Sequence, residues 1–132
     1  MARHIILLVG LMVYTVAIAE EQRNQMIVVK LTVPDAAWTI TIDEVHRVEN
    51  ELWVISTVSR SPKMGAQVIS TVQSSVTIQA PDIPEKHFIL GKTWGWENDE
   101  PYIFMRDRKQ IEKSLESGTR LYEKPTKDRK SQ

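Results

Sequence analysis

The side chains of this sequence that could carry out acid–base chemistry or bind a metal are few and poorly spaced. The chain has three histidines and no cysteine, which excludes disulfides, thiolate nucleophiles and zinc sites built on sulfur. No His-x-His or His-Glu-x-x-His spacing occurs, and no serine lies in a Gly-x-Ser-x-Gly elbow. We therefore expect no catalytic site and no metal site. His46 lies next to a predicted turn and His87 begins a predicted strand, so both are interpreted as surface residues.

An acidic run, Glu97-Asn98-Asp99-Glu100, offers oxygen atoms that could bind calcium. It lacks the spaced ligands and the turn glycine of a calcium-binding loop. A solvated acidic loop is the expected structure, and no cofactor is predicted.

The segment Gly91–Pro101 is the best candidate for contact with another molecule. It places two tryptophans, separated by one glycine, in a stretch that is otherwise polar. Exposed indole rings are costly unless a partner covers them, and the alternative is that one or both fold back as a lid over an open end of the domain. If the loop does not bind, a second predicted loop tip, Ser61–Gly65, is the next candidate. The predicted binding residues are Lys92, Trp94, Gly95, Trp96 and Glu97.

The first nineteen residues differ in composition from the rest. A short basic start precedes an apolar run from Ile5 to Val16, and Ala17-Ile18-Ala19 then supplies the small residues of a cleavage site. The run is shorter than the ~20 residues that span a bilayer as a helix. We expect residues 1–19 to be a signal peptide, and the mature chain to be periplasmic or extracellular with no membrane span.

Length and charge limit the mature part of the chain. The 132 residues fit one domain, and 17 basic residues balance 17 acidic ones, which excludes a broad nucleic-acid-binding surface. We expect a single β-rich domain at residues 20–124 and a disordered basic tail at residues 125–132. Residues 20–25 are predicted to be a frayed lead-in.

Alternating apolar residues predict strands in the first half of the domain. Residues 27–33 form one such run, and residues 38–47 and 52–58 form two more, joined by a turn at residues 48–51. The phase breaks at Asp43-Glu44, which predicts a β-bulge. Residues 52–58 are apolar on both faces, which is typical of a central strand. Trp38 and Trp53 fall in these patterns and are assigned to the core.

The pentapeptide Val-Ile-Ser-Thr-Val occurs twice, at residues 54–58 and 68–72. Folded back antiparallel, the copies match in sidedness, so they predict a hairpin; the alternative is coincidence. Ser74-Ser75 is expected to separate the second copy from a short strand at residues 76–80.

The second half of the domain is predicted to contain two short strands, one helix and a last strand. Residues 87–90 and 102–105 are the strands. Asp107 and Gln110 form a capping box, Ile111 and Leu115 an apolar stripe, and Gly118 a left-handed end to the helix. Residues 119–123 complete an all-β, mainly antiparallel fold, which is a small β-sandwich or an open barrel with one short C-terminal helix.

Residues 38–81 resemble the PrcB-like and chagasin-like β-domains of exported, protease-inhibitor-like proteins. The pattern is an aromatic residue leading an alternating strand (Trp38 to Ile42), a Ser-Pro loop (Ser61-Pro62), then Ala66 and a serine-rich run into Val76 to Ile78 and Pro81. The Asn-Pro-Thr-Thr-Gly signature of chagasin-type inhibitors is absent. The resemblance implies a module whose loops engage a protease or another envelope protein. We expect a non-enzymatic binding module with a protein partner; the alternative is a small-ligand or carbohydrate binder that uses Trp94 and Trp96 as stacking platforms.

Overall fold

The computed structural model describes residues 22–62 and 67–126. The predicted signal peptide, most of the Ser61–Gly65 tip and the end of the predicted tail lie outside the described residues. The described residues form seven strands, a 3-10 turn and one short helix. In chain order these are β1 (Arg23–Val33), β2 (Trp38–Val48), β3 (Glu51–Arg60), β4 (Ser70–Ala80), β5 (Glu85–Leu90), β6 (Ile103–Met105), η1 (Arg108–Gln110), α1 (Glu112–Ser117) and β7 (Thr119–Glu123).

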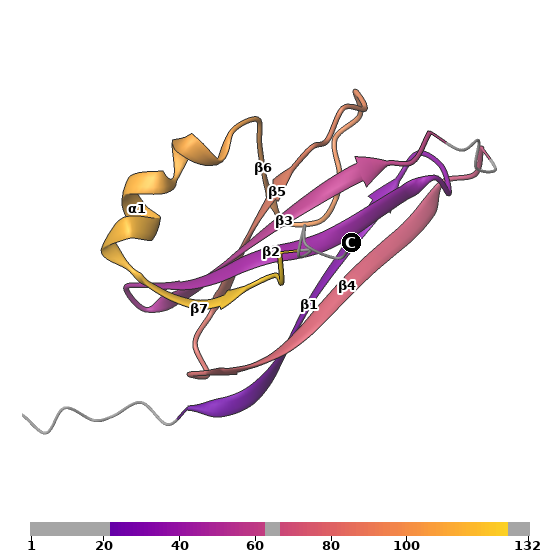
Figure 1. Ribbon diagram of the computed structural model, residues 1–132. Helices are drawn as coiled ribbons and strands as arrows, with labels where there is room; N and C mark the ends of the chain where they lie inside the picture. Colours follow the sequence, from indigo (N-terminus) through magenta and orange to yellow (C-terminus); the bar gives the residue numbers. More distant parts are fainter. Residues whose placement is uncertain (1–21, 63–66, 127–132) are drawn as a thin grey trace, which may run out of the picture.

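The strands form two sheets packed face to face, which confirms the predicted all-β, mainly antiparallel fold as a small β-sandwich. One sheet contains β1 and β4, and the other has the order β6-β5-β3-β2-β7. Figure 1 shows the pair β1–β4 on one side of the larger sheet and α1 on the opposite side. The pairs β3–β5 and β5–β6 are parallel, and the other pairs are antiparallel.

Each face of the larger sheet packs against its own hydrophobic cluster. The inner cluster lies between the sheets, and alternation along β1 places four aliphatic side chains there with no exposed surface. The second cluster lies under the helix and confirms the predicted Ile111–Leu115 stripe. The strand β3 contributes to both clusters, as the sequence predicted for a central strand. The residues of β1 in the inner cluster are Ile27, Val29, Leu31 and Val33.

The two tryptophans assigned to the core differ in depth. Trp38 is buried in the inner cluster, which confirms its assignment. Trp53 is only partly buried: its ring packs on Phe88 at the edge of the second cluster, with the Lys86 ammonium over its face.

The hairpin of β2 and β3 confirms the predicted turn and bulge. Its register shifts between Ile42 and Glu44, so that Asp43 has no partner on β3. After the shift, Val45 returns to the inner cluster, opposite Val54. The bulge therefore keeps Val45 on the inner face with Ile40 and Ile42, while Val48, at the end of the strand, packs in the cluster under the helix.

The hairpin predicted for the repeated pentapeptide is wrong. Residues 54–58 lie in β3, between β2 and β5, whereas residues 70–72 lie in β4, in the other sheet. The partner of β4 is β1, with Val33 opposite Ser70 and Arg23 opposite Ala80. Two further expectations fail with it: Ser74-Ser75 does not break β4, and the lead-in is already strand from Arg23 onward.

The C-terminal elements follow the sequence except in how the helix begins and how it ends. Asp107 and Gln110 form the predicted capping box, on η1 rather than directly on α1. Gly118 ends the helix in extended backbone (φ −97°), so the predicted left-handed cap is wrong. A Cβ atom there would overlap the carbonyl oxygen of Arg47. Glycine is needed at this point because β7 approaches β2 closely. No helix in the described ranges is long and apolar enough to cross a bilayer.

Candidate functional site

The loop between β5 and β6 is fastened to the outer edge of β1 by its own side chains. The Thr32 N–H donates to Glu100 Oε2 at 2.8 Å, and Asn98 Nδ2 donates to the Thr32 carbonyl at 2.8 Å. Nearer the middle of β1, the Lys30 N–H donates to the Tyr102 hydroxyl at 3.3 Å. Side chains thus take the place of a neighbouring strand along this part of the edge, and they fix the position of the loop.

The carboxyl group of Glu100 is held in its charged form by this arrangement. Its burial alone would raise the pKa, but the hydrogen bonds from the Thr32 N–H and the Asn98 amide outweigh burial and keep the pKa below its ordinary value. The ionised form of Glu100 is therefore favoured in the folded chain, and a charged acceptor strengthens the bond to the strand.

Trp94 is the lid that the sequence offered as one alternative. Its ring meets Trp38 edge to face, with centroids 4.9 Å apart, and its Nε1 donates to Asn98 Oδ1 at 2.9 Å. The Lys92 ammonium lies over the rings of Trp94 and Phe104. Of the predicted binding residues, Lys92 and Trp94 thus hold the loop in place through contacts with the domain.

Trp96 is exposed instead, as expected for a ring that a partner would cover. Its side chain is 40% exposed, and its ring leans on Trp94 with centroids 5.6 Å apart. An open depression of about 450 Å³ lies beside it, lined by one hydroxyl-bearing residue, the indole and three acidic residues. The chain therefore presents an indole next to several carboxylates on a loop held by a rigid strand. The lining residues are Thr32, Trp96, Glu97, Asp99 and Glu100.

The two glycines of the loop have different roles. Gly91 has φ of +96°, and a Cβ atom there would overlap the carbonyl oxygen of Val58, so both conformation and space require glycine. At Gly95 nothing lies within 4 Å of where a Cβ atom would be. The space next to Gly95 is therefore open, and Glu97, two residues further along the chain, is exposed.

Asn98, Glu100 and Tyr102 are the residues of this site that the sequence patterns did not single out as contributors. They alternate along the chain, and all three reach the edge of β1. That spacing of two is the signal that could have found them, because alternate residues of an extended segment point to the same side. The acidic run interpreted as a solvated loop is therefore partly a structural brace.

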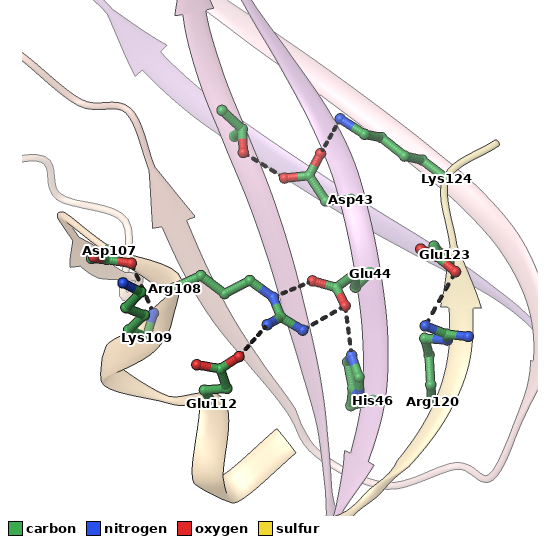
Figure 2. Close-up of polar contacts among 11 residues, drawn as sticks. Asp43, Glu44, His46, Asp107, Arg108, Lys109, Glu112, Arg120, Glu123 and Lys124 are labelled. Atoms are coloured by element: carbon green, nitrogen blue, oxygen red, sulfur yellow. Dashed lines mark hydrogen bonds and ion pairs between the residues drawn. The ribbon is translucent and has the colours of Figure 1, made fainter. Parts of the chain in front are cut away.

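A second polar cluster forms at the bulge of β2, on the face of the sheet that carries α1 (Figure 2). The bulge sends the consecutive carboxylates of Asp43 and Glu44 to this one face. Glu44 accepts from Arg108 Nε at 2.7 Å and Nη2 at 2.9 Å, and it contacts His46 Nε2 at 3.1 Å. The bidentate bond from Arg108 is the main cause that lowers the pKa of Glu44, and His46 lowers it further.

Asp43 is held by a residue of β3 and by Lys124, which directly follows β7. It accepts a hydrogen bond from Thr57 and pairs with Lys124 Nζ at 2.9 Å. The hydrogen bond to Asp43 raises the pKa of Lys124. Both carboxylates at the bulge are therefore already occupied by donors of the chain. This cluster can tie η1 and the residue that follows β7 to β2.

The prediction that both histidines lie on the surface is wrong for His46, which is buried, whereas His87 is partly buried, with 10% of its side chain exposed. His46 is 6% exposed and lies between Glu44 and the helix side of the sheet. His87 stacks on Tyr102, with centroids 4.8 Å apart, and its Nε2 contacts Glu85 at 3.0 Å. Each histidine contacts an acidic residue two positions earlier on its strand, a local pairing that the sequence patterns did not reveal. Within residues 22–62 and 67–126, no group of three or more His, Asp or Glu could hold a metal ion.

No protein-family model, no curated protein and no solved structure matches this chain.

Proposed function

We propose that this chain is an exported, non-enzymatic binding module that contacts a protein partner through Trp96 and the acidic residues next to it. The observation that carries the proposal is an exposed indole on a loop that hydrogen bonds fasten to β1. Tryptophan is among the residues that most often dominate binding energy at protein interfaces. A loop that is already ordered loses little conformational freedom when it binds.

The surroundings of Trp96 favour a basic group on the partner. Glu97 and Asp99 are exposed beside the indole, and Glu100 lines the same depression. A lysine or arginine side chain placed there can lie over the face of the ring while its charge pairs with a carboxylate. Complementary charge of this kind also speeds association and sets specificity.

The N-terminal segment and the family resemblance support the same proposal. A basic start, an apolar run and small residues at positions 17–19 are typical of a signal peptide. The resemblance of residues 38–81 to PrcB-like and chagasin-like domains implies a partner that is a protease or another protein of the envelope. The chagasin-type signature is absent, so the proposal is binding rather than inhibition.

Carbohydrate binding is the second candidate function. The same depression combines a flat indole with carboxylate oxygens, which can stack on the apolar face of a sugar and accept its hydroxyl protons. The two candidates share one surface, so they are separated by the ligand that the surface retains.

The deciding experiment compares the wild-type protein with Trp96→Ala and with Met26→Ala, a matched control at an exposed position on β1. Each is used as bait with an envelope extract, and any protein retained by the wild type is purified and titrated against all three. We expect Trp96→Ala to bind the retained protein at least ~30-fold more weakly, a loss of about 2 kcal/mol, and Met26→Ala to bind it as the wild type does. Equal affinity of Trp96→Ala and the wild type would contradict the proposal. Quenching of tryptophan fluorescence by oligosaccharides, lost in Trp96→Ala, would instead support the carbohydrate candidate.

A further inference from the structure

The strand β4 leaves one long edge of its sheet open. Lys30 and Thr32 direct their N–H groups away from β4 and toward the loop that caps β1. Because hydrogen bonding alternates along an antiparallel pair, the odd-numbered residues of β4 direct their backbone groups to the far edge. β4 is the last strand of its sheet, and no hydrogen bond within the described ranges uses these backbone groups. They belong to Thr71, Gln73, Ser75, Thr77 and Gln79.

This edge lacks the features that normally prevent strand addition. β4 has eleven residues without a charged side chain or a proline, and its register with β1 runs without a bulge. The capped part of the edge of β1 is different, because Asn98, Glu100 and Tyr102 occupy it. One edge of the small sheet is thus covered in part by the chain, while the other presents an uninterrupted row of backbone groups without charged side chains.

The sequence of β4 is nearly self-complementary about its middle. In an antiparallel pair of two such strands centred on Ser75, each Thr71 faces a Gln79, each Gln73 a Thr77, and each Val72 an Ile78. The outer face of the joined strands then carries only hydroxyl and amide side chains. Their inner face carries Val72 and Val76, which are half-buried in the single chain and become more buried when a second strand lies alongside.

We propose that two copies of this chain associate through β4, antiparallel about Ser75, into a continuous four-stranded sheet in the order β1-β4-β4-β1. We assign the open edge of β4 to a second copy of the chain for two reasons. The cross-strand pairs described above form between two strands of this same sequence, and β4 has no charged side chains that would repel each other across the axis. The loop that carries Trp96 lies beyond β1, at the opposite edge of the small sheet. The dimer therefore carries one loop at each outer edge and can engage two sites of a partner at once.

The first test measures molar mass by light scattering at protein concentrations up to about 100 μM. The wild type is expected at twice the mass of the single chain. Ser75→Lys and Ser75→Glu each place like charges opposite one another at the axis, so each is expected at the single-chain mass; mixed in equal amounts, they are expected to restore the doubled mass. Met26→Lys, the control on β1, is expected to leave the dimer intact. A wild type of single-chain mass, or a dimer that Ser75→Lys does not change, overturns the proposal.

The second test fixes the register without disturbing the edge. The chain has no cysteine, so Ser75→Cys introduces a single thiol, and two copies of it come close enough across the axis to form a disulfide. Under mild oxidation, Ser75→Cys is expected to give a covalent dimer. Thr71→Cys is expected to stay uncrosslinked, because its counterpart lies opposite Gln79. Crosslinking of Thr71→Cys alone, or equal crosslinking of the two variants, overturns the proposed pairing whatever the mass measurement shows.

Discussion

Glu44 and Arg108 lie 64 residues apart in the sequence and are joined by two hydrogen bonds, of 2.7 and 2.9 Å, across the top of the bulge in β2. The carboxylate is 14% exposed, so the pair is only partly screened by solvent. It joins η1 to β2 at the point where Asp43 has no partner on β3. The bulge thus has a structural use, since it supplies the acceptor that holds the segment before α1.

Arg108→Ala is expected to lower the free energy of unfolding by about 1–2 kcal/mol, because among the described residues it leaves the partly buried Glu44 carboxylate with His46 as its one side-chain hydrogen-bond partner. Glu44→Gln and the double variant complete a mutant cycle that isolates the pair. The matched control is Arg120→Ala, whose pair with Glu123 is more than half exposed and should contribute under about 0.5 kcal/mol. Urea unfolding at pH 7 measures all four variants. Equal losses for Arg108→Ala and Arg120→Ala would contradict this role.

Acid is expected to weaken the fold through Glu44 and Glu100. The pKa of each carboxyl is lowered in the folded chain, from an ordinary value of 4.5. Their stabilising contribution is therefore complete above that value and is lost as the pH falls through the lower folded pKa. Urea midpoints between pH 7 and pH 2.5 should decline mainly below about pH 4.5. In Glu44→Gln this decline should be smaller; a decline as steep as in the wild type would show that Glu44 does not contribute to it.

The two tryptophans of the loop are expected to respond differently to truncation. Trp94→Ala removes the contact with Trp38 and leaves the Asn98 oxygen without its indole donor, so it should cost about 2–3 kcal/mol of stability. Trp96→Ala removes a ring that is 40% exposed and should cost less than about 1 kcal/mol. Thermal melting of both variants checks the order. If Trp96→Ala were the more destabilising, Trp96 and not Trp94 would be the lid.

Three glycine-to-alanine variants should fall into two groups. Gly91→Ala and Gly118→Ala each bring a methyl group against a backbone carbonyl, and Gly91 also has a positive φ, so each should cost about 2 kcal/mol or more. Gly95→Ala is the control and should be close to neutral, since the methyl group meets only open space. Chemical unfolding of the three variants measures the difference. A neutral Gly118→Ala would mean that β7 can move away from β2.

Processing of the N-terminus is expected to give a chain that begins at Glu20. The reason is the small-residue site at Ala17-Ile18-Ala19 after an apolar run. Intact-mass measurement on protein recovered from the exported fraction decides it. A species that begins at Met1 in that fraction would contradict both the cleavage and the proposed export.

The part of the fold that could be predicted from sequence is the part that neighbouring residues determine. Alternation located the strands, and the break in phase at Asp43 located the bulge, because the two faces of β2 differ in burial. Which strands pair was not predictable in the same way. The repeated pentapeptide matched in sidedness, yet β4 pairs with β1, whose aliphatic residues at positions 27–33 complete the core with it.

The candidate site was predicted in its location and only partly in its chemistry. Two tryptophans in a polar loop marked the segment, but their composition could not decide which ring is covered. Which ring is covered depends on Trp38 and on the backbone groups of Thr32 that bind the loop, and both residues are far away in the sequence. The surface assignment of His46 failed for a similar reason, because η1 and α1 cover that side of β2 only in the folded chain.

The pairing of β1 with β4 also determines the order in which the protein can fold. β2 and β3 are adjacent in the chain and can form their hairpin within about microseconds. In contrast, β1 can pair only after β4, which ends at Ala80, is available. While the chain is being made, the aliphatic residues of β1 have no strand of their own sheet to pair with. We expect chains cut short before Ala80 to leave this first strand uncovered and to aggregate, and we expect closure of the small sheet to be the slow step of folding.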